Sequence, residues 1–496
     1  MGVRWVRSRP TVIAVVLSVV LLLAQNPSDE LERNFKNPPD SAKPRVWWHW
    51  VGGNVTKEGI TKDLEWMKRV GIGGMQMFDV GIGGGQIVDK KIIFMTPEWF
   101  NALRHAASEA DRLGLEMSMA ASGGWSETGG PWVKPEQAMK KVVWSELRVN
   151  GPQTLATKLP EPPSVNGPIR DLKRRETGFG QTANSAPGAP DPTLYRDTVV
   201  LAYQTPEEER ALANLQPKVS SNAGPIEVSA LLDDSLETGV DVPIPENGQP
   251  VWIQFEFPHP FTARALSIAL SSTSMYGSSV PIGKIEAGND GTNFSVLATL
   301  PGEEHNIRPI NVRTFAFPQT TARYFRVVFD YPSHGMRGYG RPAEPGTTPV
   351  ASPQGTPNFG QQGSTKYTVT ELIFHAGARV NRWEDKASFA PLFEYDSLAT
   401  PHIAETGVIK RASIVDLTSR ITSEGTLNWN VPPGKWTILR IGYSLTGAKN
   451  NPAVPAWQGF EVDKLNQKSS KRISTVTRTR SLAHWGHCSV NRSDIS

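Results

Sequence analysis

The sequence has very little cysteine. Cys488 is the only one in 496 residues, so neither a disulfide framework nor a cysteine-based metal or redox motif is possible. It also has no strong excess of one charge. The formal net charge is +4, which gives no electrostatic reason to expect a nucleic-acid partner.

Long apolar runs are absent except near the start. Arg4, Arg7 and Arg9 precede an apolar stretch from Thr11 to Ala24. A basic start followed by a short apolar core is typical of a signal peptide, and the core is short for a membrane span. We therefore predict that residues 1–25 are a signal peptide, that the protein is exported to the periplasm or outside the cell, and that no stable membrane span remains after cleavage. An uncleaved anchor is the alternative.

The periodic part of the chain begins with a strand, helix and strand over residues 45–81. Residues 46–50 are apolar and aromatic, as in a buried strand. Thr56 can cap a helix whose apolar stripe is Ile60, Leu64 and Met67, and Gly71 suits the position after the helix. A second apolar run over residues 72–80 completes a βαβ unit with parallel strands.

A further helix and strand follow. Thr96 and Pro97 suit the start of a helix, and Gly114 suits its end. The helical stripe comprises Trp99, Leu103, Ala106, Ala110 and Leu113. Residues 115–121 are predicted to be the third strand of the same sheet.

Unusual side chains follow the C-terminal ends of these strands, where ligands bind in parallel α/β folds. The candidate site residues are Trp48, His49, Trp50, Asp79, Trp125 and Glu127. Glycines surround them, and about half of the 15 tryptophans lie between residues 47 and 144. Indole rings with nearby polar groups suit a sugar, whose C–H faces stack while its hydroxyls hydrogen-bond. The alternative for each residue is an ordinary place in the core.

The remainder of the chain has a different pattern. Residues 150–192 are rich in proline and glycine, so 150–215 is predicted to be a linker that includes one strand, at 197–203. Residues 216–378 contain short strands separated by turns, which favours an inserted β-sandwich, with a loop at 333–365. Residues 379–465 are predicted to return to the first domain, since 457–463 again combine tryptophan, glycine and acidic residues.

Residues 466–496 are basic and have no apolar periodicity. The codons of residues 476–495 can be chosen so that another reading frame encodes YTDPLAGALGPLFGQSLRY. This string is more typical of a folded segment than the present one. We expect a frameshifted tail, and an ordinary disordered basic tail is the alternative. Resequencing the gene across the codon for Gln467 is the test.

The strings WWHWVGGNVTKEGI and GGPWV, with the later QGFEVDK, resemble glycoside hydrolase family 106, the α-L-rhamnosidases. The match is close over residues 38–149 and looser to about residue 465. One departure is AASGG before Trp125, where an asparagine- or proline-bearing turn is expected.

The resemblance implies a (β/α)8 TIM-type barrel interrupted by a β-sandwich that is galactose-binding-like. Residues 30–149 would then be the first βα units of an incomplete barrel, and the fold class is α/β plus β. It also implies an exported, inverting enzyme that removes L-rhamnose from plant or other glycans. A rhamnose-containing oligo- or polysaccharide is the expected partner, and calcium is implied by the family alone.

An inverting glycosidase needs two carboxyl groups about 6.5–9.5 Å apart, one acid and one base. In the family these come from later strands, and neither Asp79, Glu127 nor Glu461 matches them. We therefore expect a chain truncated before its catalytic carboxylates and inactive by itself. Asp79 is expected to orient a sugar hydroxyl or support a cation, and His49 to contact the sugar. The alternatives are a non-catalytic carbohydrate-binding protein, an inactive fragment or, with least support, a structural or adhesion protein.

Overall fold

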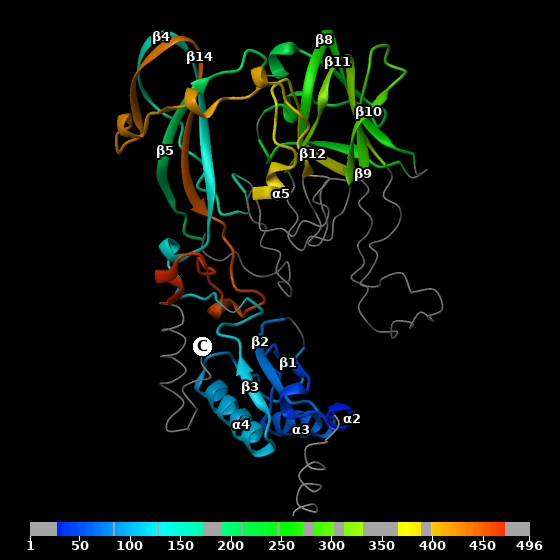
Figure 1. The fold of residues 1–496 in the computed structure, drawn as a ribbon, viewed down its shortest axis with the longest axis vertical. Helices are drawn as coiled ribbons and strands as arrows, with labels where there is room; N and C mark the ends of the chain where they lie inside the picture. The colour runs from blue at the N-terminus through cyan, green and yellow to red at the C-terminus, as the bar shows by residue number, and fades with distance from the viewer. Residues whose placement is uncertain are drawn as a thin grey trace, which may run out of the picture. The chain divides into compact units, whose positions relative to one another are not determined.

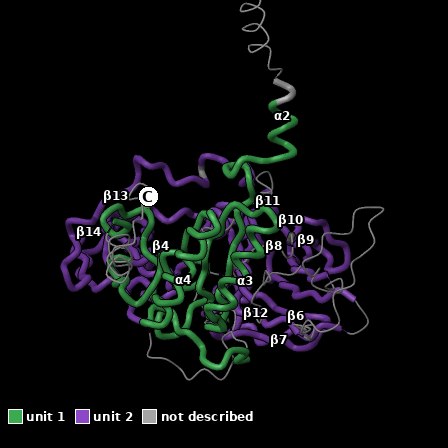
Figure 2. Tube along the Cα trace, turned by 90° about the horizontal axis from the view of Figure 1, so that it is seen from below, with its two compact units in different colours: residues 1–137, 178–187, 449–496 green, residues 138–177, 188–448 purple. Residues whose placement is uncertain are grey.

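The structure, a computed structural model, describes most of the chain. The described residues are 27–82, 85–126, 128–167, 169–171, 191–209, 212–233, 235–245, 249–270, 282–301, 312–330, 366–387 and 398–471. Two compact units are formed, residues 1–137 with 178–187 and 449–496, and residues 138–177 with 188–448 (Figure 2). No helix among the described residues has the length and apolar character needed to cross a membrane.

The first unit contains a three-stranded parallel sheet, ordered β1-β2-β3 (Figure 1). Along the chain, helix α3 connects β1 to β2 and helix α4 connects β2 to β3. Its elements are α2 (Pro27–Lys36), β1 (Arg45–Val51), α3 (Lys57–Arg69), β2 (Gly74–Val80), α4 (Pro97–Leu113) and β3 (Glu116–Met119). The βαβ prediction and the third strand are confirmed. In the described part of the chain this sheet does not close, so the (β/α)8 barrel is not confirmed.

The predicted helix ends are confirmed in detail. Thr56 Oγ1 accepts a hydrogen bond from the Gly59 N–H at 3.0 Å, and Thr96 caps α4 in the same way through Trp99 N. Gly114 ends α4 in the left-handed region, with φ of 60°. The stripes of both helices pack with side chains of the strands in one core.

The second unit contains an antiparallel β domain. Seven strands form its sheet, β6 (Lys218–Ser221), β7 (Val240–Pro243), β8 (Val251–Leu270), β9 (Ile282–Gly288), β10 (Ser295–Pro301), β11 (Val312–Phe329) and β12 (Lys366–His375). The sequence pattern predicts VWIQFEFP and ARALSIAL as two separate short strands, but these strings are the two halves of β8. Likewise, β11 contains both RTFAFP and ARYFRVVF, which the pattern predicts as separate strands. Side chains of both halves of β8 lie in one apolar core.

A four-stranded antiparallel sheet, ordered β13-β5-β14-β4, also belongs to the second unit. Its strands are β4 (Lys140–Lys158), β5 (Tyr195–Gln204), β13 (Val415–Asp416) and β14 (Thr426–Leu445), and the short helix α5 (Trp383–Ala387) precedes the last two. Two boundaries differ from the sequence prediction. β4 continues past residue 149 into the expected linker, because it pairs with β14 over its whole length. Accordingly, only the part of 379–465 from Lys449 onward belongs to the first unit.

Some predictions fall outside the described residues. They concern the signal peptide, Glu127, the loop at 333–365 and residues 472–496 of the tail. Residues 467–471 of the tail are described and helical. The frameshift and the export of the protein stay predictions.

Candidate functional site

The side chains of β1 alternate between two faces of the parallel sheet, as in any strand. Trp48 and Trp50 point to the helices, where they are 7% and 2% exposed and belong to the core. Trp48 Nε1 also donates a hydrogen bond to Asp63 Oδ2 of α3 at 3.0 Å. For these two tryptophans the structure shows the core placement that the sequence left open, and it places them away from His49.

Asp79 lies on the helix side as well, since it stands beside Trp50 in the β1–β2 register. Its side chain is buried, and its Oδ2 accepts a hydrogen bond from Trp99 Nε1 at 2.9 Å. Burial raises the pKa of Asp79 to about 7, although the Trp99 hydrogen bond opposes this shift. The expectation that Asp79 and His49 both face a sugar therefore needs correction, because consecutive register positions point to opposite faces.

The opposite face, here called the open face, carries Trp47, His49, Phe78 and Trp125. His49 stacks on Phe78 with ring centroids 5.5 Å apart and planes 25° apart. Trp47 meets Phe78 edge-on at 5.5 Å, and Trp125 meets His49 at 6.1 Å. Trp47 is 69% exposed and Trp125 40% exposed. Large aromatic surface left in solvent in this arrangement indicates a ligand-binding face.

A hydrogen bond determines the chemical state of His49. Trp125 Nε1 lies 2.9 Å from His49 Nε2. Because an indole N–H can only donate, Nε2 accepts, and the imidazole is neutral with its proton on Nδ1. Burial lowers the pKa of His49, which also favours the neutral ring. The open face thus offers an N–H donor between aromatic rings and carries no charge on the histidine.

The segment that follows Lys449 holds the loop of Trp125 in place. Trp125 N donates to the Asn451 carbonyl at 3.0 Å, and Asn451 N donates to Ser126 Oγ at 3.2 Å. The fully buried Asn450 donates from Nδ2 to Gly123 O at 2.9 Å and accepts from Gly459 N at 2.8 Å. The bonds of Asn450 and Asn451 to residues 123–126 join positions more than 300 apart and explain how the loop keeps its shape.

Glu461 is buried in the same unit. It is 4% exposed, and Lys464 Nζ donates to its Oε2 at 2.8 Å. Glu127, the other acidic candidate of this region, lies outside the described residues. Among the described residues no group of three or more His, Cys, Asp or Glu side chains could hold a metal ion. Calcium stays a prediction from the family resemblance alone, and we derive no step through it.

Three residues of this region were not predicted as site residues. Trp47 and Phe78 stand next to predicted site residues on β1 and β2. Because side chains two positions apart on a strand point to the same face, His49 indicates that Trp47 shares its face. Phe78 stands opposite His49 in the parallel register, which the sequence does not show. Asn450 had no local signal, because its partners lie far away in the chain.

Comparison with known proteins identifies the family. A family model described as α-L-rhamnosidase, of the glycoside hydrolases, matches residues 36–476. The chain belongs to this α-L-rhamnosidase family. The resemblance stated from the sequence is thereby confirmed.

Two relatives show how much of the family's architecture is present. A solved structure of a rhamnosidase from Novosphingobium sp. PP1Y is 34% identical, with a TM-score of 0.70, and the match covers 92% of this chain and 38% of that one. A putative β-glucuronidase from Formosa agariphila is 46% identical over 189 residues, 38% of this chain and 14% of its own length. The chain therefore spans well under half the length of both relatives.

Proposed function

We propose that the open face is the sugar-contacting wall of an α-L-rhamnosidase that cleaves rhamnose-containing oligo- or polysaccharides with inversion. The observation that carries this proposal is the Trp125–His49 hydrogen bond. It holds a neutral N–H donor between two exposed indole rings, and family membership supplies the reaction class.

The chemistry of L-rhamnose suits such a wall. This 6-deoxy sugar presents a methyl group and C–H bonds that pack on aromatic rings, while its hydroxyls need a few donors and acceptors. A glucuronide, the substrate class named for one relative, carries a carboxylate and is normally bound by a cation. Because His49 is neutral on this face, we favour the rhamnoside.

The acid and the base of an inverting reaction are separated by about 6.5–9.5 Å, with a water between them. Asp79 is bonded to Trp99 on the other side of the sheet, and Glu461 is paired with Lys464. We propose that neither belongs to the catalytic pair and that β1, β2 and β3 are the first strands of a (β/α)8 barrel. The 496-residue chain is then expected to bind rhamnosides without hydrolysing them.

The alternative function is a glycan-binding protein that has no catalytic role. Both proposals expect binding without turnover. An experiment that supplies the catalytic carboxylates therefore separates them. Coexpressed downstream sequence from the alternative frame should restore turnover of an aryl α-L-rhamnoside if the chain is part of an enzyme. No gain of turnover would favour the binding protein.

The binding proposal is tested with 4-nitrophenyl α-L-rhamnoside and 4-nitrophenyl β-D-glucuronide. Saturation-transfer NMR should show contact with the rhamnoside and little with the glucuronide, and nitrophenolate should not be released. His49→Ala should weaken the contact, because it removes the donor and one ring of the face. His105→Ala, on α4, is the matched control and should leave the contact unchanged. Release of nitrophenolate would contradict the proposal that this chain does not hydrolyse rhamnosides. Stronger contact with the glucuronide would contradict the proposal that the open face binds rhamnose.

A further inference from the structure

The pairing between β8 and β11, the two longest strands of the β domain, is interrupted at two places. Ala316 pairs with Ala265 and Thr320 with Ala263, so residues 317–319 of β11 stand opposite the single residue Arg264 of β8. A second interruption places residues 257–260 of β8 opposite Arg323. Bulges of this kind turn side chains out of the ladder and are common beside binding sites.

A cavity of about 430 Å³ lies at these interruptions. Its apolar lining includes Leu215, Phe257 and Phe261, and its polar lining includes Glu208, Thr262 and Gln319. This volume is within the range of about 300–1,000 Å³ that is usual for small-molecule sites. The lining therefore combines apolar surface with several hydrogen-bonding groups that differ in kind.

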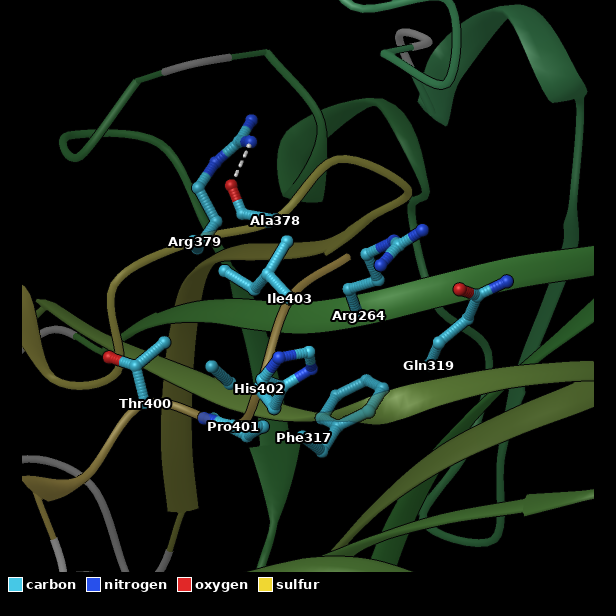
Figure 3. Close-up of a pocket in the computed structure, with 10 residues that line it drawn as sticks. Arg264, Phe317, Gln319, Ala378, Arg379, Thr400, Pro401, His402 and Ile403 are labelled. Atoms are coloured by element: carbon cyan, nitrogen blue, oxygen red, sulfur yellow. Dashed lines mark hydrogen bonds between the residues drawn. The ribbon is translucent and has the colours of Figure 1, made fainter. Parts of the chain in front are cut away.

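A smaller hollow, shown in Figure 3, shares the lining residue Gln319 with the cavity. Its volume is about 10 Å³, enough for about one water or hydroxyl group. Arg264 lines it beside His402, and the arginine is only 8% exposed. Glu208 pairs with the Arg264 Nη2 at 2.9 Å, whereas the buried Arg264 Nε has no hydrogen-bond partner among the described residues. A buried donor without a partner is costly, and a ligand oxygen would satisfy it.

We propose that this cavity is a second carbohydrate-binding site, which takes one neutral sugar residue of a glycan. Sugar hydroxyls both donate and accept, which suits a carboxylate, an amide and a hydroxyl in one lining. An acidic sugar suits the site less well, because Glu208 lines the cavity and already neutralises Arg264. Leu215, Pro258 and Pro260, which are not buried, provide apolar surface for C–H groups.

The test uses the full chain with His49→Ala, so that the open face does not contribute. The probes are the methyl glycosides of L-rhamnose, D-galactose, D-glucose and D-glucuronic acid, observed by saturation-transfer NMR. At least one neutral glycoside should show contact. Gln319→Trp, which fills the cavity from an exposed position, should abolish that contact, and Gln319→Ala should weaken binding about fivefold through one lost hydrogen bond.

The matched control is Gln204→Ala, an exposed glutamine of β5 outside the cavity lining, and it should leave binding unchanged. Circular dichroism checks that each variant is folded. Contact with none of the neutral glycosides, contact only with the glucuronide, or contact that survives Gln319→Trp would each overturn the proposal. Failure of the proposed function is a separate result, because it would appear as rhamnoside contact in the wild-type chain that His49→Ala leaves unchanged.

Discussion

The two faces of the β1–β2 sheet carry the same kinds of side chain and use them differently. On the helix side, Trp50 and Asp79 are buried, and Trp99 covers them. On the open face, Trp47 and Trp125 keep much of their surface in solvent around His49. On β1, the exposed Trp47 and the buried Trp48 are adjacent residues.

The difference shows that an aromatic cluster in a sequence can serve stability and binding at once. Burial of a tryptophan removes a large apolar surface from water and contributes several kcal/mol, whereas an exposed ring contributes little to folding. The exposed rings of the open face are therefore available to a ligand. This comparison makes three predictions, from the largest expected effect to the smallest.

The largest effect is expected from the paired changes Trp50→Ala and Trp47→Ala. Trp50→Ala leaves a cavity in the core and should lower the free energy of unfolding of the first unit by about 3–5 kcal/mol. Trp47→Ala should lower it by less than about 1 kcal/mol, and it should weaken rhamnoside binding. Hydrogen exchange of the amides in β2 measures the local stability. Equal losses for the two variants would show that the two faces do not differ as described.

The second effect concerns the pH dependence of stability on the helix side. The pKa of Asp79 is about 7 in the folded protein and 3.8 ordinarily, so the folded protein holds this proton more tightly than the unfolded chain. Stability from this group is therefore greatest below about pH 4, falls as the pH rises to about 7, and changes no further above that. The difference between the two pKa values corresponds to a loss of at most about 4 kcal/mol in the free energy of unfolding.

Asp79→Asn should remove this slope, because an amide does not ionise but can still accept from Trp99. Thermal unfolding followed by fluorescence between about pH 4.5 and 8 measures the slope in both proteins. Asp63→Asn is the matched control, since Asp63 accepts the Trp48 indole N–H but is exposed. A slope that persists in Asp79→Asn would assign the pH dependence to another group.

The smallest effect is expected from Trp125→Phe on the open face. Phenylalanine keeps an aromatic ring but cannot donate to His49 Nε2, so the imidazole loses the bond that selects its tautomer. Rhamnoside binding should weaken about fivefold, the value of one hydrogen bond, with little change in stability. Trp66→Phe, at an exposed tryptophan of α3, is the control. Binding unchanged in Trp125→Phe would mean that the hydrogen bond does not prepare the site.

Local features of the fold could be predicted from the sequence. The caps at Thr56 and Thr96 and the stripe of Ile60, Leu64 and Met67 depend only on residues within a few positions of one another. The halves of β8 were predicted as separate strands because the PHP sequence at 258–260 is a turn signal. Pairing with β11 on both sides of that signal keeps β8 one strand.

The candidate site could be predicted in part. His49 and Trp125, chosen separately from the sequence, are hydrogen-bonded to each other. Trp48, Trp50 and Asp79 were chosen by their position at strand ends, which does not show the direction of a side chain. Alternation would have grouped Trp48 with Trp50, but only the packing of α3 and α4 shows which group is buried.

The sequence by itself determined the parallel βαβ start, the family resemblance and the aromatic stretch that contains His49, because these are encoded by adjacent residues. The tertiary structure decided which face of β1 is open and that Asp79 lies in the core. It also brought Asn450 and Asn451 to the loop of Trp125. These outcomes depend on contacts between residues up to about 330 positions apart, and the free energy of such contacts is not written in any local pattern.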